Sequence, residues 1–210
     1  MRVIIFGGSG FVGQAIIKAI QKASLAAVSE PYEIISVSRH GKPEGTALSD
    51  IGVTWVAADV FQPTTWANYV RSGDIVIDAI GIFYQHKKRD VTYKKMHYEA
   101  AIVIANICEE QDASQLFYIS AAHGIPFFKE YLVWKRHAEE KLLAMQTPVV
   151  ILRPSLLYSR RHQYYLANAI LLAKKLPIIG TFFRKMNPLQ VEKFASNVVE
   201  NIEQTSQVQR

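Results

Sequence analysis

A glycine-spaced turn follows the first apolar run of the chain and limits the choice of fold more than any other segment. The run at residues 2–6 leads directly into Gly7-Gly8-Ser9-Gly10-Phe11-Val12-Gly13, after which a helical pattern begins. At a strand–turn–helix junction Gly7 permits the tight turn, Gly10 lets the backbone approach a diphosphate, and Gly13 lets helix and strand pack closely. Free N–H groups and the positive end of the helix dipole favour phosphate oxygens there. The turn therefore predicts a dinucleotide site made by Gly7, Gly10, Phe11, Val12 and Gly13.

Short β-branched runs alternate with helical patterns along the rest of the chain, which is typical of a parallel sheet covered on both faces. Right-handed crossovers predict the strand order 3-2-1-4-5-6. We expect a single α/β domain over residues 1–210, a Rossmann-type doubly wound parallel sheet with its core at 1–160. A short C-terminal helical extension, 161–210, should lie on the substrate side. The expected strands are 2–6, 33–38, 53–57, 74–79, 115–120 and 148–152, and the expected helices are 11–27, 63–71, 92–112, 128–146, 162–176 and 190–204.

The end of the second expected strand bears on which nicotinamide dinucleotide is bound. NAD sites place Asp or Glu there to bind the ribose 2′-hydroxyl, whereas this chain reads Ser36-Val37-Ser38-Arg39. Ser38 and Arg39 are expected to hold a 2′-phosphate, so NADP(H) is favoured over NAD(H). Other strand ends at the same edge place Asp59 and Val60 beside the adenine, and Ala79 and Gly81 beside the adenosine ribose. The alternatives are that Arg39 is a solvated loop residue, and that the residues at the other strand ends belong to ordinary turns.

Three polar residues predict a site for carbonyl–alcohol interconversion. Ser120 ends the fifth expected strand, and Tyr131 and Lys135 lie one helical turn apart on one face of the next helix. Such a reaction needs a proton donor at the carbonyl oxygen while hydride is transferred. A tyrosine can donate if a neighbouring ammonium lowers its pKa, and a serine hydroxyl can hold the same oxygen.

Taken in order, the motifs resemble the short-chain dehydrogenase/reductase superfamily in its extended or atypical branch. They are the glycine turn, Ala58-Asp59, Tyr118-Ile119-Ser120-Ala121, Tyr131-x-x-x-Lys135-x-x-x-Glu139 and Leu152-Arg153-Pro154, and they cover roughly residues 1–160. Within the superfamily the chain is most similar to a quinone-linked group. This group includes a protein of the coenzyme Q synthesis complex and the nucleotide-binding accessory subunit of respiratory complex I.

The resemblance implies roles for individual residues. Ser120 would orient the substrate, Tyr131 would be the acid/base, and Lys135 would hold ribose hydroxyls of the cofactor and tune Tyr131. The backbone from Pro154 to Leu156 would face the nicotinamide amide, while Arg153 would tie the sixth strand to neighbouring loops. His97 stands where many relatives have an asparagine that supports a proton-relay water. It is equally consistent with a residue that merely starts a helix.

Composition narrows the function further. The formal net charge is +6, yet no nucleic-acid-binding architecture is recognisable. The single cysteine, Cys108, excludes an internal disulfide, and neither a metal site nor an oxidising compartment is indicated. The first apolar run is too short for a spanning helix, so a cytoplasmic protein is expected. The apolar stretch 164–185, flanked by cations, is expected to wall a pocket, join a dimer, lie on a membrane surface or pack on its own core.

These observations predict an NADP(H)-dependent oxidoreductase that acts on a small or apolar carbonyl or quinone-related compound. The alternative is an accessory or sensor protein that binds NADP(H) without catalysis. The presence of Ser120, Tyr131 and Lys135 favours the enzyme. His97, the short C-terminal tail and the apolar surface favour the sensor.

Overall fold

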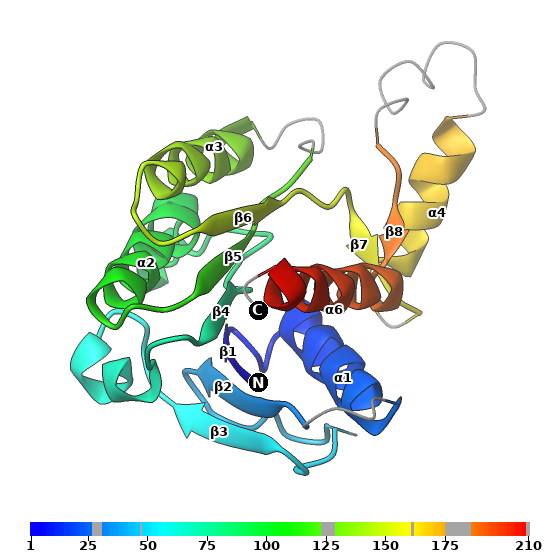
Figure 1. The fold of residues 1–210 in the computed structure, drawn as a ribbon. Helices are drawn as coiled ribbons and strands as arrows, with labels where there is room; N and C mark the ends of the chain where they lie inside the picture. The colour runs from blue at the N-terminus through cyan, green and yellow to red at the C-terminus, as the bar shows by residue number, and fades with distance from the viewer. Residues whose placement is uncertain (27–30, 47, 123–128, 161, 175–185, 209–210) are drawn as a thin grey trace.

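The computed structural model describes the chain except for residues 27–30, 47, 123–128, 161, 175–185 and 209–210. Six parallel strands form one sheet in the order β3-β2-β1-β4-β5-β6 (Figure 1), which confirms the predicted Rossmann-type topology. The direction of strand addition reverses between β1 and β4, so a crevice opens there at the carboxyl edge. The strands are β1 (Arg2–Phe6), β2 (Glu33–Ser38), β3 (Val53–Ala57), β4 (Ile75–Asp78), β5 (Gln115–Ile119) and β6 (Val149–Leu152).

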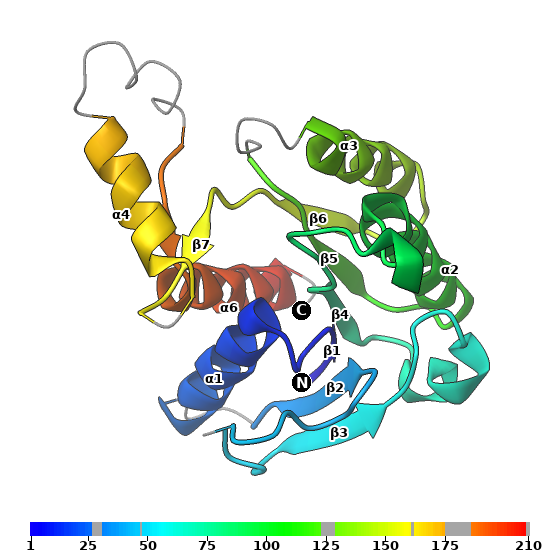
Figure 2. The ribbon, with the colours of Figure 1, turned by 180° about the vertical axis from the view of Figure 1, so that it is seen from behind.

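Helices cover both faces of the sheet, which is why the central strands are apolar along their whole length. On one face lie α1 (Phe11–Ala26) and α6 (Val191–Val208); on the other lie α2 (Ala100–Glu110) and α3 (Lys129–Leu143) (Figures 1 and 2). In β1, Val3 and Ile5 pack toward α1 and α6, while Ile4 and Phe6 pack toward α2. Each face of the sheet therefore has its own hydrophobic core.

Two of the predicted helices take a different form. The prediction of one helix at 63–71 is wrong, because the chain makes two 3-10 turns there, η1 (Pro63–Thr65) and η2 (Ala67–Tyr69). Trp66 separates them because its φ of −141° lies outside the helical region. Its ring is fully buried against Phe6, and its Nε1 donates to the carbonyl of Val60. Tertiary packing of one large side chain has overridden the local helical pattern.

The expected helix at 92–112 begins as a π-helical segment, η4 (Lys94–Glu99), and continues as α2. A further short 3-10 turn, η3 (Lys87–Arg89), precedes it. Segments of π-helix are rare and often occur at functional sites. This one carries the buried His97, which faces the crevice described below.

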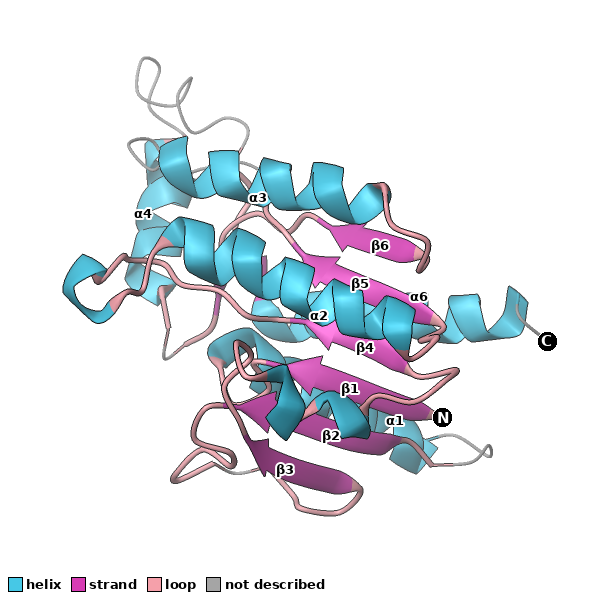
Figure 3. Cartoon of the chain, turned by 90° about the vertical axis from the view of Figure 1, so that its left-hand side faces the viewer, coloured by secondary structure: helices cyan, strands magenta, loops and turns pink. Residues whose placement is uncertain are grey.

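After β6 the chain leaves the sheet and forms the C-terminal extension. It contains β7 (Leu157–Tyr158), α4 (Tyr164–Ala173) and β8 (Leu189–Gln190) before α6 returns to pack on α1. Strands β7 and β8 pair with each other in parallel. The strand arrows of the main sheet point toward the side on which α4 lies (Figure 3), so the extension stands at the carboxyl edge. Residues 177–185, between the expected helices at 162–176 and 190–204, lie outside the described residues.

Candidate active site

The glycine turn adopts the geometry that its spacing predicts. Gly7 has a φ of +78°, and the N–H of Gly10 donates to its carbonyl at 2.9 Å. A Cβ on Gly13 would come within 2.3 Å of the Gly7 oxygen and 2.5 Å of the Gly8 Cα, so no larger residue fits. The chain therefore enters α1 through a tight cradle of backbone amides. A diphosphate needs this arrangement at the end of β1.

Two cavities, of about 280 and 290 Å³, adjoin along this edge of the sheet. Both are lined by Gly10 and by the strip 79–82, which follows β4. They therefore form one continuous groove across the point where the strand order reverses. Gly7 lines one part, Phe11 and Val12 line the other, and Gly13 lies behind both, where it permits close packing.

The cavity beside β2 and β3 contains every residue expected near the adenosine. It is lined by Ser38, Arg39, Asp59 and Val60, together with the shared Ala79 and Gly81. The Ser38 hydroxyl accepts the N–H of Ser9 at 3.0 Å, and so ties β2 to the glycine turn. Asp59 accepts the N–H of Phe61 at 3.0 Å, so its carboxylate also serves an ordinary turn.

Cations line the same cavity. Arg39 is exposed, and none of the described residues forms an ion pair with its guanidinium. Nearby Lys42, by contrast, pairs with Asp50 at 2.6 Å. Arg89 and Lys95 reach the cavity from the opposite wall, where Lys95 pairs with Asp90. Arg39 is thus the cation most available to a phosphate at the end of β2.

The second cavity, beside β5 and β6, brings together Ser120, Tyr131, Lys135 and Pro154. The ring of Tyr131 lies 4.8 Å from that of His97, measured between centroids, which makes His97 a further lining residue. Burial, and secondarily the nearby Tyr93, raises the pKa of Tyr131 to about 12. This direction is opposite to the one expected from the sequence, because burial outweighs any help from Lys135.

The Lys135 ammonium is held in place by contacts within the fold. Its Nζ donates to the carbonyl of Ile119 at 2.6 Å and lies 4.6 Å from the centre of the Tyr118 ring. Burial lowers the pKa of Lys135 to about 8, although Asp78 and Glu139 favour its charged form. A lysine with this pKa can exchange a proton near neutral pH.

Asp78 is a buried carboxylate that the sequence analysis missed. It ends β4 beside Tyr118 in the strand register and is only 1 % exposed. Its Oδ1 accepts the N–H of Ile80 at 2.9 Å, whereas its buried Oδ2 has no hydrogen-bond partner among the described residues. Burial raises the pKa of Asp78 to about 6, even though the Lys135 charge opposes that rise. The signal in the sequence that could have found it is an acidic residue directly after the apolar run 75–77.

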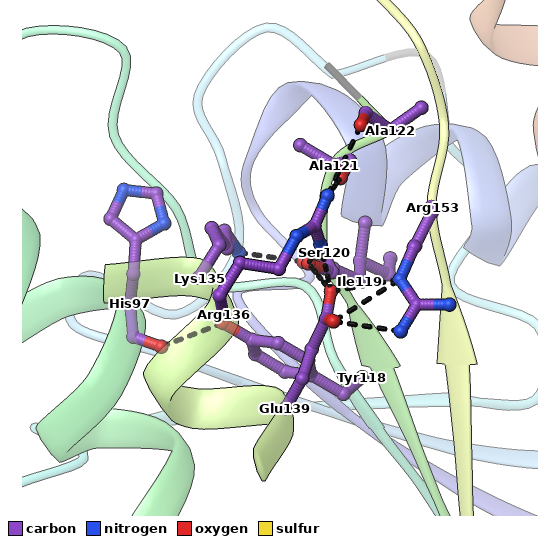
Figure 4. Close-up of polar contacts among 10 residues, drawn as sticks. All are labelled: His97, Tyr118, Ile119, Ser120, Ala121, Ala122, Lys135, Arg136, Glu139 and Arg153. Atoms are coloured by element: carbon purple, nitrogen blue, oxygen red, sulfur yellow. Dashed lines mark hydrogen bonds and ion pairs between the residues drawn. The ribbon is translucent and has the colours of Figure 1, made fainter. Parts of the chain in front are cut away.

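The Ser120 hydroxyl is directed into the protein. It donates to Glu139 of α3, whose carboxylate also binds Arg136 and Arg153 (Figure 4). Burial would raise the pKa of Glu139, but the hydrogen bonds from Arg153 and Ser120 hold it below its ordinary value. Arg153 thus ties β6 to α3. Ser120 lines the cavity, but its hydroxyl already donates its hydrogen bond to Glu139 in this ion-pair cluster.

His97 is fixed from two sides. Its Nε2 lies 3.1 Å from the carbonyl of Ile82, and its own carbonyl accepts the Tyr118 hydroxyl at 2.7 Å (Figure 4). Burial, and then the charge of Lys135, lowers the pKa of His97 well below its ordinary value. The residue lies inside η4, so it does not simply start a helix.

A family model described as NAD(P)H-binding matches residues 7–173, which contain the glycine turn and both cavities. The chain belongs to the NAD(P)H-binding family. It therefore binds a nicotinamide dinucleotide, and the amide cradle and groove fit that ligand.

Two proteins are related to this chain in sequence. An uncharacterised chloroplastic protein of Arabidopsis thaliana is 34% identical over 167 residues; the match covers 76% of this chain and 52% of the plant protein. The chain thus spans about half the length of that relative. MIOREX complex component 2 of Saccharomyces cerevisiae is 26% identical over 268 residues, covering 96% of this chain and 93% of the yeast protein.

Solved structures confirm the short-chain dehydrogenase/reductase type of fold. The oxidoreductase ylbE from Lactococcus lactis superposes with a TM-score of 0.70 at 18% identity, covering 98% of this chain and 86% of that one. A UDP-galactose 4-epimerase gives 0.70 at 11% identity, over 99% and 73%. The UDP-glucuronic acid 4-epimerase from Bacillus cereus, in complex with NAD, gives 0.62 at 16% identity, over 82% and 63%.

Over the described part of the chain, no three His, Cys, Asp or Glu residues are grouped to hold a metal ion. Among the helices described, none is long and apolar enough to cross a bilayer.

Proposed function

We propose that this family member is an NADP(H)-dependent oxidoreductase acting on a small or apolar carbonyl or quinone-related compound. The observation that carries the proposal is the continuous groove, which places Tyr131 and Lys135 at one end and Ser38 and Arg39 at the other. A dinucleotide whose diphosphate lies on the amide cradle would extend its two halves into these two ends.

Each end of the groove has a task in the reaction. NADP(H), when bound, supplies or accepts the hydride. At the adenosine end, Arg39 would bind the 2′-phosphate. At the other end, Tyr131 would hold and donate a proton at the substrate oxygen, and Lys135 would hold the ribose hydroxyls and stabilise the phenolate electrostatically. Because the pKa of Tyr131 is about 12, bound cofactor and substrate must act together with Lys135 to make proton transfer favourable.

The walls around Tyr131 favour an apolar substrate. Ile82, Phe83, Leu156 and Met186 line this cavity, and few polar side chains besides those already named reach it. Apolar walls with a small number of polar groups are typical of sites that bind small organic molecules. A carbonyl or quinone oxygen would find its proton donor in Tyr131.

Turnover tests the proposed chemistry. NADPH oxidation is measured with a panel of carbonyls and quinones for the parent, Tyr131→Phe and Tyr69→Phe. We expect Tyr131→Phe to lower kcat by about 100-fold or more, because a general acid contributes at least that much. Tyr69 is the matched control, since it lies on η2, away from both cavities. No turnover above background, or an unaffected Tyr131→Phe, would disprove the enzymatic proposal.

Cofactor preference has a separate test. Arg39→Ala is expected to weaken NADPH binding by about 10- to 100-fold and leave NADH nearly unchanged, because one charge-assisted contact is lost. Lys42→Ala is the control, since Asp50 already pairs with that lysine. Equal affinities of the parent for NADPH and NADH, measured by calorimetry, would contradict the preference for NADP(H).

One observation favours a second function, NADP(H) binding without catalysis. The Ser120 hydroxyl donates a hydrogen bond to the Glu139 carboxylate, and the Lys135 ammonium donates one to the Ile119 carbonyl. Two of the three expected catalytic groups therefore have structural partners. Tight NADPH binding with no turnover, and with Tyr131→Phe unchanged, is the result this alternative predicts.

The cytoplasmic location also remains a prediction, and a fluorescent fusion tests it against an organelle such as the chloroplast.

A further inference from the structure

The charge of the chain is distributed very unevenly. The 51 residues from Lys141 to Val191 contain no Asp or Glu, although the whole chain has 18. The same stretch carries eight of the 24 basic residues. Such a one-sided segment attracts an anionic surface. The eight are Lys141, Arg153, Arg160, Arg161, Lys174, Lys175, Arg184 and Lys185.

Helix α4 lies in this stretch and is apolar on both sides. It contains no charged residue. Ala167 and Ile170 on its inner side pack against Leu156 and Met186. The large side chains on its outer side are open to solvent. They are Tyr164, Tyr165 (87% exposed), Leu166, Leu171 and Leu172 (66% exposed).

Ordinary surface helices present polar residues to water, so this outer side calls for an apolar partner. Exposed Arg160 precedes the helix and Lys174 follows it. The α4 helix stands apart from the main sheet in both ribbon views (Figures 1 and 2), which leaves its outer side accessible. Tyrosine rings are favoured at the headgroup level of a membrane, and exposed leucines gain by burial in its apolar layer.

We propose that the outer side of α4 docks the protein on an anionic lipid surface. Charge decides between a bilayer and a second copy of this chain. In a symmetric dimer the same surface faces itself, so the acid-free stretch would meet its own cations. An anionic bilayer would attract the cations that flank the helix, Arg160 and Lys174, and take up the exposed leucines and tyrosines.

The docking would also select the substrate. The inner side of α4 packs on Leu156 and Met186, and both residues line the cavity that contains Tyr131. Helix α4 thus has this apolar end of the groove on its inner side and the docking surface on its outer side. Resting on the proposed function, the inference is that the carbonyl or quinone substrate is a bilayer-dissolved molecule that enters beside α4.

Vesicle binding tests the docking without any turnover. The full chain is sedimented with phosphatidylcholine vesicles and with vesicles that also contain phosphatidylglycerol. Binding is expected only to the anionic vesicles and should weaken as salt is added. Leu171→Glu combined with Leu172→Glu should lower the partition at least tenfold, because apolar contact becomes like-charge repulsion. The matched control is Leu25→Glu, an 89% exposed leucine on α1.

Each outcome bears on the proposal. Absence of binding to anionic vesicles overturns it, as does an equal loss with Leu25→Glu. A dimer in light scattering that the α4 variant dissociates, without vesicle binding, assigns the surface to a second copy instead. Vesicle binding that persists in a protein with no turnover would support the docking while disproving the enzymatic proposal.

Discussion

Replacing Asp78 by Asn should change how the stability of the protein depends on pH. The amide keeps the shape of the buried side chain and removes its titration. The carboxyl pKa is about 6 in the folded protein against an ordinary value of 3.8. At about 1.4 kcal/mol for each pKa unit, this difference corresponds to about 3 kcal/mol. Between these two pKa values the folded state binds more protons than the unfolded state, so the free energy of unfolding falls as pH rises.

Urea unfolding of the parent and of Asp78→Asn, from about pH 4 to about pH 7, measures this effect. Lys135, with a pKa of about 8, stays mostly protonated over that interval in the parent. The unfolding free energy of Asp78→Asn, relative to the parent, should therefore increase by about 2.4 kcal/mol across the range, because the unfolded carboxyl is already half ionised at its lower end. Asp112→Asn removes an exposed carboxylate as a control. Parallel pH profiles for the parent and Asp78→Asn would refute the reasoning.

Three further predictions concern single residues. Gly13→Ala should abolish NADPH binding in calorimetry, whereas Gly10→Ala should be milder, because its Cβ would lie 3.1 Å from the Gly7 oxygen rather than 2.3 Å. His97 should stay neutral and show no titration in NMR spectra between about pH 5 and 8, because burial and Lys135 disfavour its charged form. The buried Cys108 thiol, whose pKa burial raises to about 12, should react with thiol reagents only when the protein unfolds.

The sheet was predictable because its signal is local. Each strand is a short apolar run, and the glycine turn marks the first crossover of a dinucleotide-binding sheet. Right-handed crossovers in such a sheet then predict the order of the six strands. Trp66 marks the limit of this reasoning. Nothing in the residues around it shows that its ring would fill the space beside Phe6, and that contact divides the expected helix at 63–71 into two turns.

The candidate site was predictable in its members but not in their interactions. Motif spacing brought Tyr131 and Lys135 to one cavity, as the structure also places them. Spacing cannot show that Lys135 donates a hydrogen bond to the Ile119 carbonyl, or that Ser120 donates one to the Glu139 carboxylate. The buried state of Asp78 depends on the register of β4 beside β5, a contact between residues 40 positions apart in sequence.

The pairing of β7 with β8 has a consequence for how proteins of this type can diverge. Leu157 and Leu189 are register partners, so the chain departs from and rejoins the body of the protein at nearly one point. The segment between them can change in length or composition while α6 still packs on α1 and the glycine turn keeps its shape. The proposed substrate selection and membrane docking would therefore evolve as an exchangeable insert, independently of the diphosphate site.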